Sequence, residues 1–152
     1  MYIKQSELFR GTSMDFVKKF MDISEMSSHK QGEVLFSEND PAKFFFILLN
    51  GHVKLSVGEP KQAIYYAARN GEAFGWSSLI GGDVYSASAE CIEPTKILKT
   101  SSDKLSRVLE ADPDNGIIFF KQLAATLGNR LLETYKMINK KTEDRGQKSE
   151  VR

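Results

Sequence analysis

The apolar residues of this chain change their period twice, and that change limits the possible folds more than any other feature. Between residues 33 and 101 the apolar runs are about four to eight residues long, and turn residues separate them about every 8 to 12 residues. On both sides of this stretch, apolar residues recur at spacings of three, four and seven, as in amphipathic helices. The pattern predicts a β-sandwich or barrel with helices at both ends.

The first part of the chain provides the N-terminal helices and the first strands. Residues 1–30 are predicted to be helical, with Ser13 as the N-cap of a helix over 14–22. Three consecutive phenylalanines, 44–46, fit a strand that is buried on both faces. Asn50-Gly51 predicts a two-residue hairpin, because both residues tolerate a positive φ. The predicted strands read EVLF, KFFFILL, HVKLSVG, QAIYYAAR, VYSASAECI and KILKTS, with GEAFG as a turn and WSSLI as one helical turn.

The helical period returns at Ser102, which is predicted to cap a short helix that ends before Pro113. A second helix, capped by Asp114, would run for about 25 residues, or about 38 Å at 1.5 Å per residue. The polar residues after it are predicted to be disordered. The chain is accordingly divided into a β-roll with N-terminal helices (1–113), a long helix (114–141) and a polar tail (142–152).

The long helix carries an apolar stripe and several basic residues. Phe119, Ala124 and Leu132 add apolar area beside the stripe, and a long helix with two apolar flanks can pack on its own domain and on a second copy of itself. A homodimer is the first interpretation, and packing within one domain is the alternative. The basic residues, Lys121, Arg130, Lys136, Lys140 and Lys141, are interpreted as a solvated face. The stripe, and so the predicted dimer interface, consists of Phe120, Leu123, Leu127, Leu131, Thr134 and Ile138.

The composition limits the functions that this chain can have. A chain of 152 residues with a net charge of +1 has room for one domain and offers no bulk attraction for nucleic acid or anionic lipid. The single cysteine, Cys91, excludes an intramolecular disulfide, and no apolar run reaches the length of a membrane helix. His29 and His52 are interpreted as surface residues, so no metal site and no catalytic set is predicted. A cytoplasmic location follows from the lack of an apolar leader.

Two segments resemble known sequences. GEVLFSENDPAKFFFILLNGHVKL resembles the opening strands of cyclic-nucleotide-binding domains, and GEAFGWSSLIGGDVYSASAECIEPTKIL resembles their phosphate-binding cassette and the strands that follow. The last two helices are similar to those of the catabolite-activator superfamily of bacterial sensors. This resemblance covers about residues 10–140. It implies a mainly β fold, a double-stranded β-helix (jelly-roll β-roll) with N-terminal helices and a long C-terminal helix.

In such domains the cassette binds the cyclic phosphate through backbone amides and an Arg, and a Glu accepts a hydrogen bond from the ribose. Here Trp76 stands in the position of the Glu and Tyr85 in that of the Arg. Losing two charged contacts would cost ~3–6 kcal/mol, or on the order of 10² to 10⁴ in affinity. The residues that the resemblance assigns to ligand binding are Phe74, Gly75, Trp76, Ser77, Ser78, Leu79, Tyr85, Ser86 and Ala87.

The resemblance therefore implies a standalone regulatory or sensor module that is not an enzyme, does not bind cAMP or cGMP tightly and signals through an unidentified protein partner. Either its own side chains fill the pocket, or the pocket accepts a different small molecule. Superfamily members that bind DNA carry a further domain after the long helix, and the polar residues after 141 cannot form one, so direct nucleic-acid binding is not expected. Two alternatives remain open: a genuine cyclic-nucleotide regulator with an altered cassette, and a ligand-free structural module.

Overall fold

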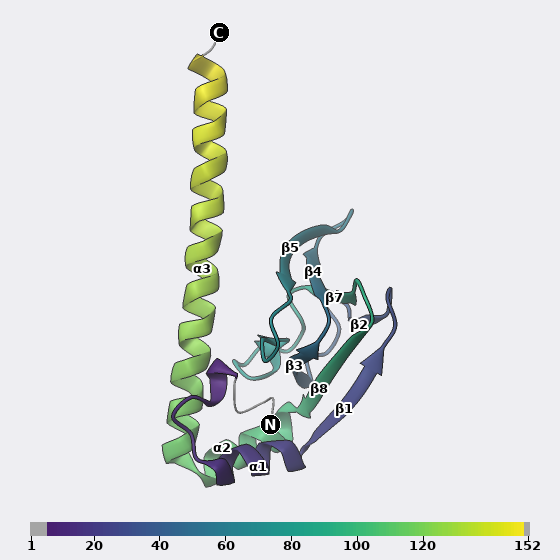
Figure 1. Ribbon diagram of the computed structural model, residues 1–152, viewed down its shortest axis with the longest axis vertical. Helices are drawn as coiled ribbons and strands as arrows, with labels where there is room; N and C mark the ends of the chain where they lie inside the picture. The colour runs from purple at the N-terminus through teal and green to yellow at the C-terminus, as the bar shows by residue number, and fades with distance from the viewer. Residues whose placement is uncertain (1–5, 151–152) are drawn as a thin grey trace.

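The structure is a computed structural model that describes residues 6–150, with the side chains of residues 6–143. It is a β-roll of two four-stranded antiparallel sheets, with helices before and after it (Figure 1). The predicted fold class is confirmed. The elements are η2 (Glu7–Phe9), α1 (Met14–Asp22), β1 (Ser24–His29), β2 (Val34–Phe36), β3 (Phe44–Asn50), β4 (Val53–Val57), β5 (Gln62–Ala67), β6 (Ala73–Phe74), η3 (Trp76–Ser78), β7 (Ser88–Cys91), β8 (Thr95–Ser101), α2 (Ser102–Ala111) and α3 (Pro113–Glu150).

The strands are shared between two sheets, in the orders β1-β8-β3-β6 and β2-β7-β4-β5. The predicted hairpin at Asn50-Gly51 is therefore wrong, because β3 and β4 pair in different sheets. Gly51 does adopt a positive φ of 118°, and a Cβ there would collide with Thr95. The dipeptide correctly predicts a sharp change of direction, but long-range burial decides which strands pair.

Two short segments also differ from the prediction. The helix predicted over residues 1–30 ends at Asp22, and residues 24–29 form the edge strand β1 against β8. Residues 1–5 lie outside the described part of the chain. The GEAFG segment is not only a turn, since Ala73 and Phe74 pair with β3 as β6. Both strands are short and take their stability from their neighbours, which local periodicity cannot reveal.

The three consecutive phenylalanines serve two different cores. The side chain of Phe45 lies in a cluster between the roll and the helices, while that of Phe46 lies in the cluster inside the roll. This alternation confirms that β3 is buried on both faces. In the first cluster, the ring of Phe119 contacts those of Phe9, Phe16, Phe20 and Phe45. The start of α3 is thereby packed against the N-terminal segment.

The helix caps confirm one prediction and shift two. Ser13 caps α1 as predicted, accepting from the amide of Phe16 at 3.1 Å. The cap of α2 is Ser101 instead of Ser102, because the Ser101 hydroxyl accepts from the amide of Lys104.

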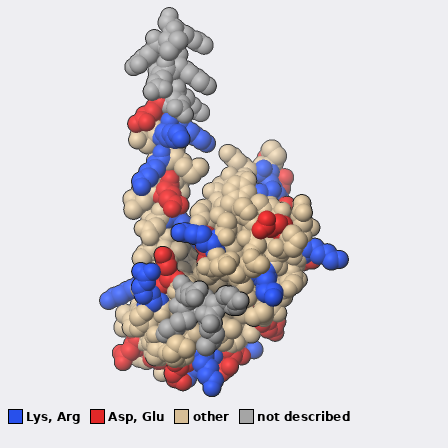
Figure 2. Space-filling model, viewed as in Figure 1, with Lys and Arg blue, Asp and Glu red and all other residues tan. Residues whose placement is uncertain are grey.

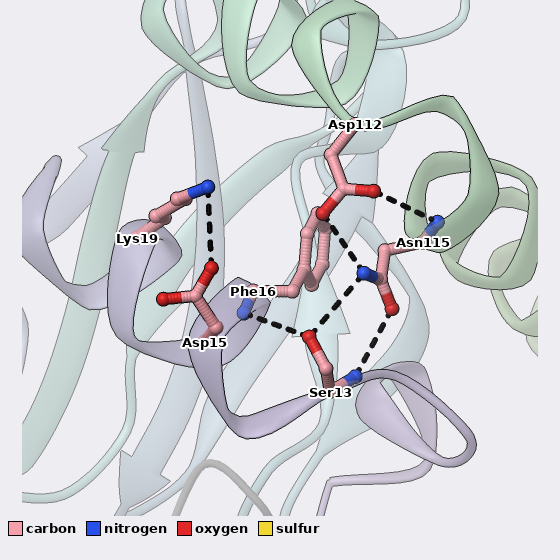
Figure 3. Close-up of polar contacts among 6 residues, drawn as sticks. All are labelled: Ser13, Asp15, Phe16, Lys19, Asp112 and Asn115. Carbon is pink, nitrogen blue, oxygen red and sulfur yellow. Dashed lines mark hydrogen bonds and ion pairs between the residues drawn. The ribbon is translucent and has the colours of Figure 1, made fainter.

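The start of α3 is likewise capped by Asp112 instead of Asp114, with Pro113 as the first helical residue. Asn115 joins this start to the cap of α1 (Figure 3): its Oδ1 accepts from the amide of Ser13 at 3.0 Å, and its Nδ2 donates to the Ser13 hydroxyl at 3.3 Å and to Asp112 at 2.8 Å. These bonds tie the first and last helices together.

Helix α3 is longer than predicted, with 38 residues, and it extends well past the roll (Figure 1). The prediction of disorder after residue 141 is wrong for residues 142–150, which continue the helix, while 151–152 lie outside the described part. The division into 1–113, 114–141 and 142–152 stays an interpretation. None of the helices within residues 6–150 has both the length and the apolar composition needed to span a bilayer.

Candidate functional site

The cassette, residues 75–87, begins at a glycine that the backbone requires. Gly75 has a φ of 72°, and a Cβ there would lie 2.8 Å from Cδ2 of Phe46. The chain then turns into η3, whose first amides have no acceptor within so short a helix. Phe74, just before the glycine, is fully buried and stacks on Phe46 with ring centroids 5.2 Å apart. The cassette thus starts from a rigid aromatic base.

The small residues of the cassette mainly shape its own loop. The Ser78 hydroxyl donates to the carbonyl of Gly75 at 3.2 Å, and the carbonyl of Ser77 accepts from the amide of Gly82 at 2.9 Å. Ser86 is exposed. Leu79 packs on the cluster between roll and helices, and Ala87 belongs to the cluster inside the roll.

Tyr85 does not face a ligand space. Its side chain is buried and stacks on Phe36, with ring centroids 3.9 Å apart. Its hydroxyl donates to the carbonyl of Phe44 at 2.8 Å and accepts from the amide of the same residue at 3.1 Å. Burial raises the pKa of the phenol above its ordinary value. The structure therefore places this residue in the core, where it ties the cassette to the start of β3.

Trp76 is partly buried and packs against both hydrophobic clusters. Its ring also meets a cation that does not come from the cassette. The guanidinium carbon of Arg130, on α3, lies 4.4 Å from the Trp76 ring centroid and 4.5 Å from that of Tyr65, on β5. We call the space beside these two rings the aromatic slot. Cation–π attraction of this kind strengthens when water is excluded.

Polar groups complete the aromatic slot. Nη2 of Arg130 donates to the carbonyl of Ala73 at 2.6 Å and lies 3.7 Å from Oε2 of Glu72. The same carboxylate oxygen accepts from the hydroxyl of Tyr65 at 2.8 Å. The side chains of Arg130 and Glu72 are only 12% and 6% exposed, so the pair is largely removed from water. Arg69, which is 77% exposed, approaches the other oxygen of Glu72 at 3.6 Å.

The environment shifts the pKa of three groups in the slot. Burial lowers the pKa of Arg130, with the nearby Tyr65 and Glu72 opposing the shift. Burial, followed by its hydrogen bond to Glu72, raises the pKa of the Tyr65 phenol. The charge of Glu72 raises the pKa of Arg69. At neutral pH, Glu72 thus faces two cations and one phenol proton.

A cavity of about 210 Å³ borders this cluster, between the loop before β6, the N-terminal segment and α3. Its wall includes the side chains of Arg130 and Glu72. Three carboxylates and two guanidinium groups line it, so its charge balance favours cations slightly. The acidic and basic lining residues are Glu7, Glu72, Glu133, Arg69 and Arg130.

Three residues of the slot were not predicted from the sequence, namely Tyr65, Glu72 and Arg130. The interpretation of Arg130 as part of a solvated face is wrong, because its side chain is 12% exposed. A signal was present: Phe119, Leu123 and Thr126 precede Arg130 at spacings of four, three and four, so all four share the face that meets the roll. A single cation that continues a buried stripe needs a buried partner.

The predicted dimer stripe divides between two faces of α3. Leu123 is 2% exposed and Leu127 packs on the first cluster, so both serve the domain itself. Phe120, Leu131 and Ile138 are 41%, 51% and 59% exposed. Thr134 is also exposed, and its hydroxyl donates to the carbonyl of Arg130. The dimer itself stays a prediction.

Other chemistry in the described residues is weaker. His29 contacts Glu33 through Nδ1 at 2.6 Å and Ser27 through Nε2 at 2.8 Å. No group of three metal-ligating side chains occurs within residues 6–143. On the face shown in Figure 2, positive and negative side chains are interspersed, without a broad area of one sign.

Similar proteins agree with the fold. Human cGMP-dependent protein kinase 2 is 28% identical over 89 residues, which are 57% of this chain and only 12% of the kinase. A putative cyclic nucleotide-binding protein from Geobacter metallireducens is 28% identical with a TM-score of 0.73, covering 82% of this chain and 91% of that one. A cyclic nucleotide-binding domain from Methylobacillus flagellatus reaches a TM-score of 0.80 at 23% identity, covering 92% and 82%.

The match is also found at the level of the family. The sequence profile of the cyclic nucleotide-binding domain fits residues 26–112, which is more than half of the 152 residues. The matched range begins at the third residue of β1 and includes the other strands of both sheets and the whole cassette. The resemblance stated from the sequence is thereby confirmed. This chain belongs to the cyclic nucleotide-binding domain family.

Proposed function

We propose that this chain is a regulatory module that does not bind cAMP or cGMP tightly and that reports the state of its pocket to a partner protein through α3. One observation carries the proposal. Arg130, which lies over the Trp76 ring of the cassette, is also engaged by the ring of Tyr65, by the carbonyl of Ala73 and by Glu72. A cyclic phosphate would have to compete with all of these groups for the guanidinium.

The two replaced positions support the same proposal. The indole of Trp76 offers no acceptor to a ribose hydroxyl, and the hydroxyl of Tyr85 is already bonded to the backbone of Phe44. A nucleotide would therefore lose two charged contacts, which corresponds to on the order of 10² to 10⁴ in affinity.

The route of the signal follows from the same side chain. Arg130 belongs to α3 but is held by groups of the roll, so any change in the slot alters the attachment of the helix. Helix α3 extends past the roll and carries exposed apolar residues, which are suited to contact a second protein or a second copy of the chain (Figure 1). The module would act by binding, without catalysis.

A second candidate function, genuine binding of a cyclic nucleotide, is favoured by the 28% identity to a kinase named for its dependence on cGMP. Isothermal titration calorimetry with cAMP and cGMP separates the two. We expect no saturable heat below about 100 µM nucleotide, given the loss of two charged contacts. A cyclic-nucleotide-binding domain that has Glu and Arg at the positions of Trp76 and Tyr85 is the positive control. A dissociation constant below about 10 µM would overturn the proposal in favour of the second candidate.

A further inference from the structure

Most groups of the aromatic slot attract cations, and this bears on the class of ligand that the slot can bind. The faces of two aromatic rings carry negative potential, and both rings meet the same guanidinium carbon. The carbonyl of Ala73 is 2.6 Å from Nη2, and the carboxylate of Glu72 is 6% exposed. An anion placed here would face two π-systems, a carbonyl and a buried carboxylate.

The buried carboxylate makes a cation necessary. A carboxylate that is withdrawn from water is costly unless a positive charge is close to it. The hydroxyl of Tyr65 donates to Glu72, but a neutral donor does not balance the charge. Arg69 lies 3.6 Å away and is 77% exposed, so solvent weakens its contribution. Arg130 is the buried cation that balances the negative charge of Glu72.

Arg130 fills the slot without using all of its donors. Its Nη2 is bonded to Ala73, whereas Nη1 lies buried with no hydrogen-bond partner among the described residues. A guanidinium has five N–H donors in one plane, and those on Nη1 are left without a partner in the described part of the chain. The neighbouring cavity of about 210 Å³ has room for a small molecule, and its lining includes Arg130, Glu7 and Glu133.

We propose that Trp76, Tyr65 and Glu72 form a binding site for a planar organic cation of the guanidinium class, which Arg130 occupies from within the same chain. This inference rests on the proposed function, because it names the ligand class of the proposed regulatory pocket. A cationic effector would exchange with Arg130 and free that part of α3 from the roll. The cassette has no basic residue of its own, and the slot beside it would therefore hold a cation instead of a phosphate.

The chain offers a direct readout of this site. Trp76 is its only tryptophan, so fluorescence excited selectively at tryptophan reports on the surroundings of this one ring. The variant Arg130→Met keeps an unbranched apolar side chain on the helix and removes the charge, which empties the cation position with little loss of packing. The probe is methylguanidinium chloride at millimolar concentrations. Methylurea, which is planar and neutral, and sodium chloride at equal ionic strength are the matched controls.

We expect methylguanidinium to change the Trp76 fluorescence of Arg130→Met saturably, while methylurea and sodium chloride do not. The double variant Arg130→Met with Glu72→Gln should bind methylguanidinium at least about tenfold more weakly, because it lacks the charged acceptor. The wild-type chain should respond only at higher methylguanidinium concentrations than the variant, since the probe must first displace the guanidinium of Arg130.

Two results would overturn the inference. One is a folded Arg130→Met variant, by circular dichroism, whose fluorescence does not respond to methylguanidinium. The other is an unfolded variant that methylguanidinium fails to refold, because a ligand that binds the native state must raise its melting temperature. Micromolar binding of cAMP by the wild-type chain would instead overturn the proposed function, so the two failures are distinguishable.

Discussion

Tyr85 stands where the family resemblance places a cationic ligand contact, and the structure gives it a different task. Its hydroxyl makes two hydrogen bonds with the backbone of Phe44, and its ring is 3% exposed. Tyr85→Phe would leave both backbone groups without this partner, which should lower the free energy of unfolding by ~1–3 kcal/mol in urea titrations. Tyr66→Phe, at a position that is 49% exposed, is the control and should stay within ~0.5 kcal/mol of wild type. Equal effects of the two changes would contradict this role.

The same residue predicts how stability depends on alkaline pH. Burial raises the pKa of the Tyr85 phenol, so the folded state holds the proton more tightly than the unfolded chain does. Its contribution to stability is therefore complete below the ordinary pKa of about 10 and is lost as pH rises through the higher folded value. The phenylalanine variant has no such proton. Its free energy of unfolding should fall less steeply than that of wild type as the pH rises above about 10.

At this scale the sequence located the cassette but not its cation. Gly75, Trp76 and Tyr85 lie in one segment with a recognisable pattern, so the resemblance could single them out together, although it could not show that Tyr85 is buried. Arg130 is 54 positions after Trp76, and only the packing of α3 on the roll brings the two together. The local sequence pattern can show that the cassette lacks a basic residue, but it cannot show which distant residue supplies one.

Among the elements, the polar contacts between α1 and α3 depend on one side chain, as Figure 3 shows. Asn115 bonds to the amide and the hydroxyl of Ser13 and to Asp112. Asn115→Ala should lower the free energy of unfolding by about 1 kcal/mol, because three largely exposed hydrogen bonds are lost. Asn129→Ala removes the same side chain from an exposed position of the same helix and gains the same helix propensity. If both variants have the same stability, the joint contributes nothing.

The elements themselves were predicted wherever the period was long and regular, as in α1 and α3. The wrong predictions concern segments whose structure depends on the strand that they pair with. Residues 24–29 became a strand because β8 offers an edge, and Asn50-Gly51 connects two sheets because Phe45 and Phe46 serve opposite cores. Turn chemistry and hydrophobic period describe single segments, whereas pairing between segments is a property of the assembled roll.

For the whole molecule, the open question is what covers the exposed apolar row on α3. Ile117, Ala124, Leu131 and Ile138 are exposed and lie seven residues apart, with Phe120 between the first two. A seven-residue repeat is the spacing that keeps one seam of a helix facing a parallel or antiparallel partner helix. Leu123 and Leu127, which the roll covers, lie beside this row and not in it. The row is therefore available to a second copy of the chain.

We expect the wild-type chain to be a dimer by light scattering, because an exposed row of seven-residue spacing is suited to a partner helix. Leu131→Glu places a charge within the row and should shift the mass toward the monomer, because burying an unpaired carboxylate at the seam is costly. Met137→Glu introduces the same charge at a position that is 60% exposed and outside the row, so it should leave the dimer intact. A wild-type monomer, or equal masses for the two variants, would assign α3 to a different partner. In a dimer held this way, release of Arg130 on one helix would reach the second copy directly, since Leu131 is the next residue along the chain.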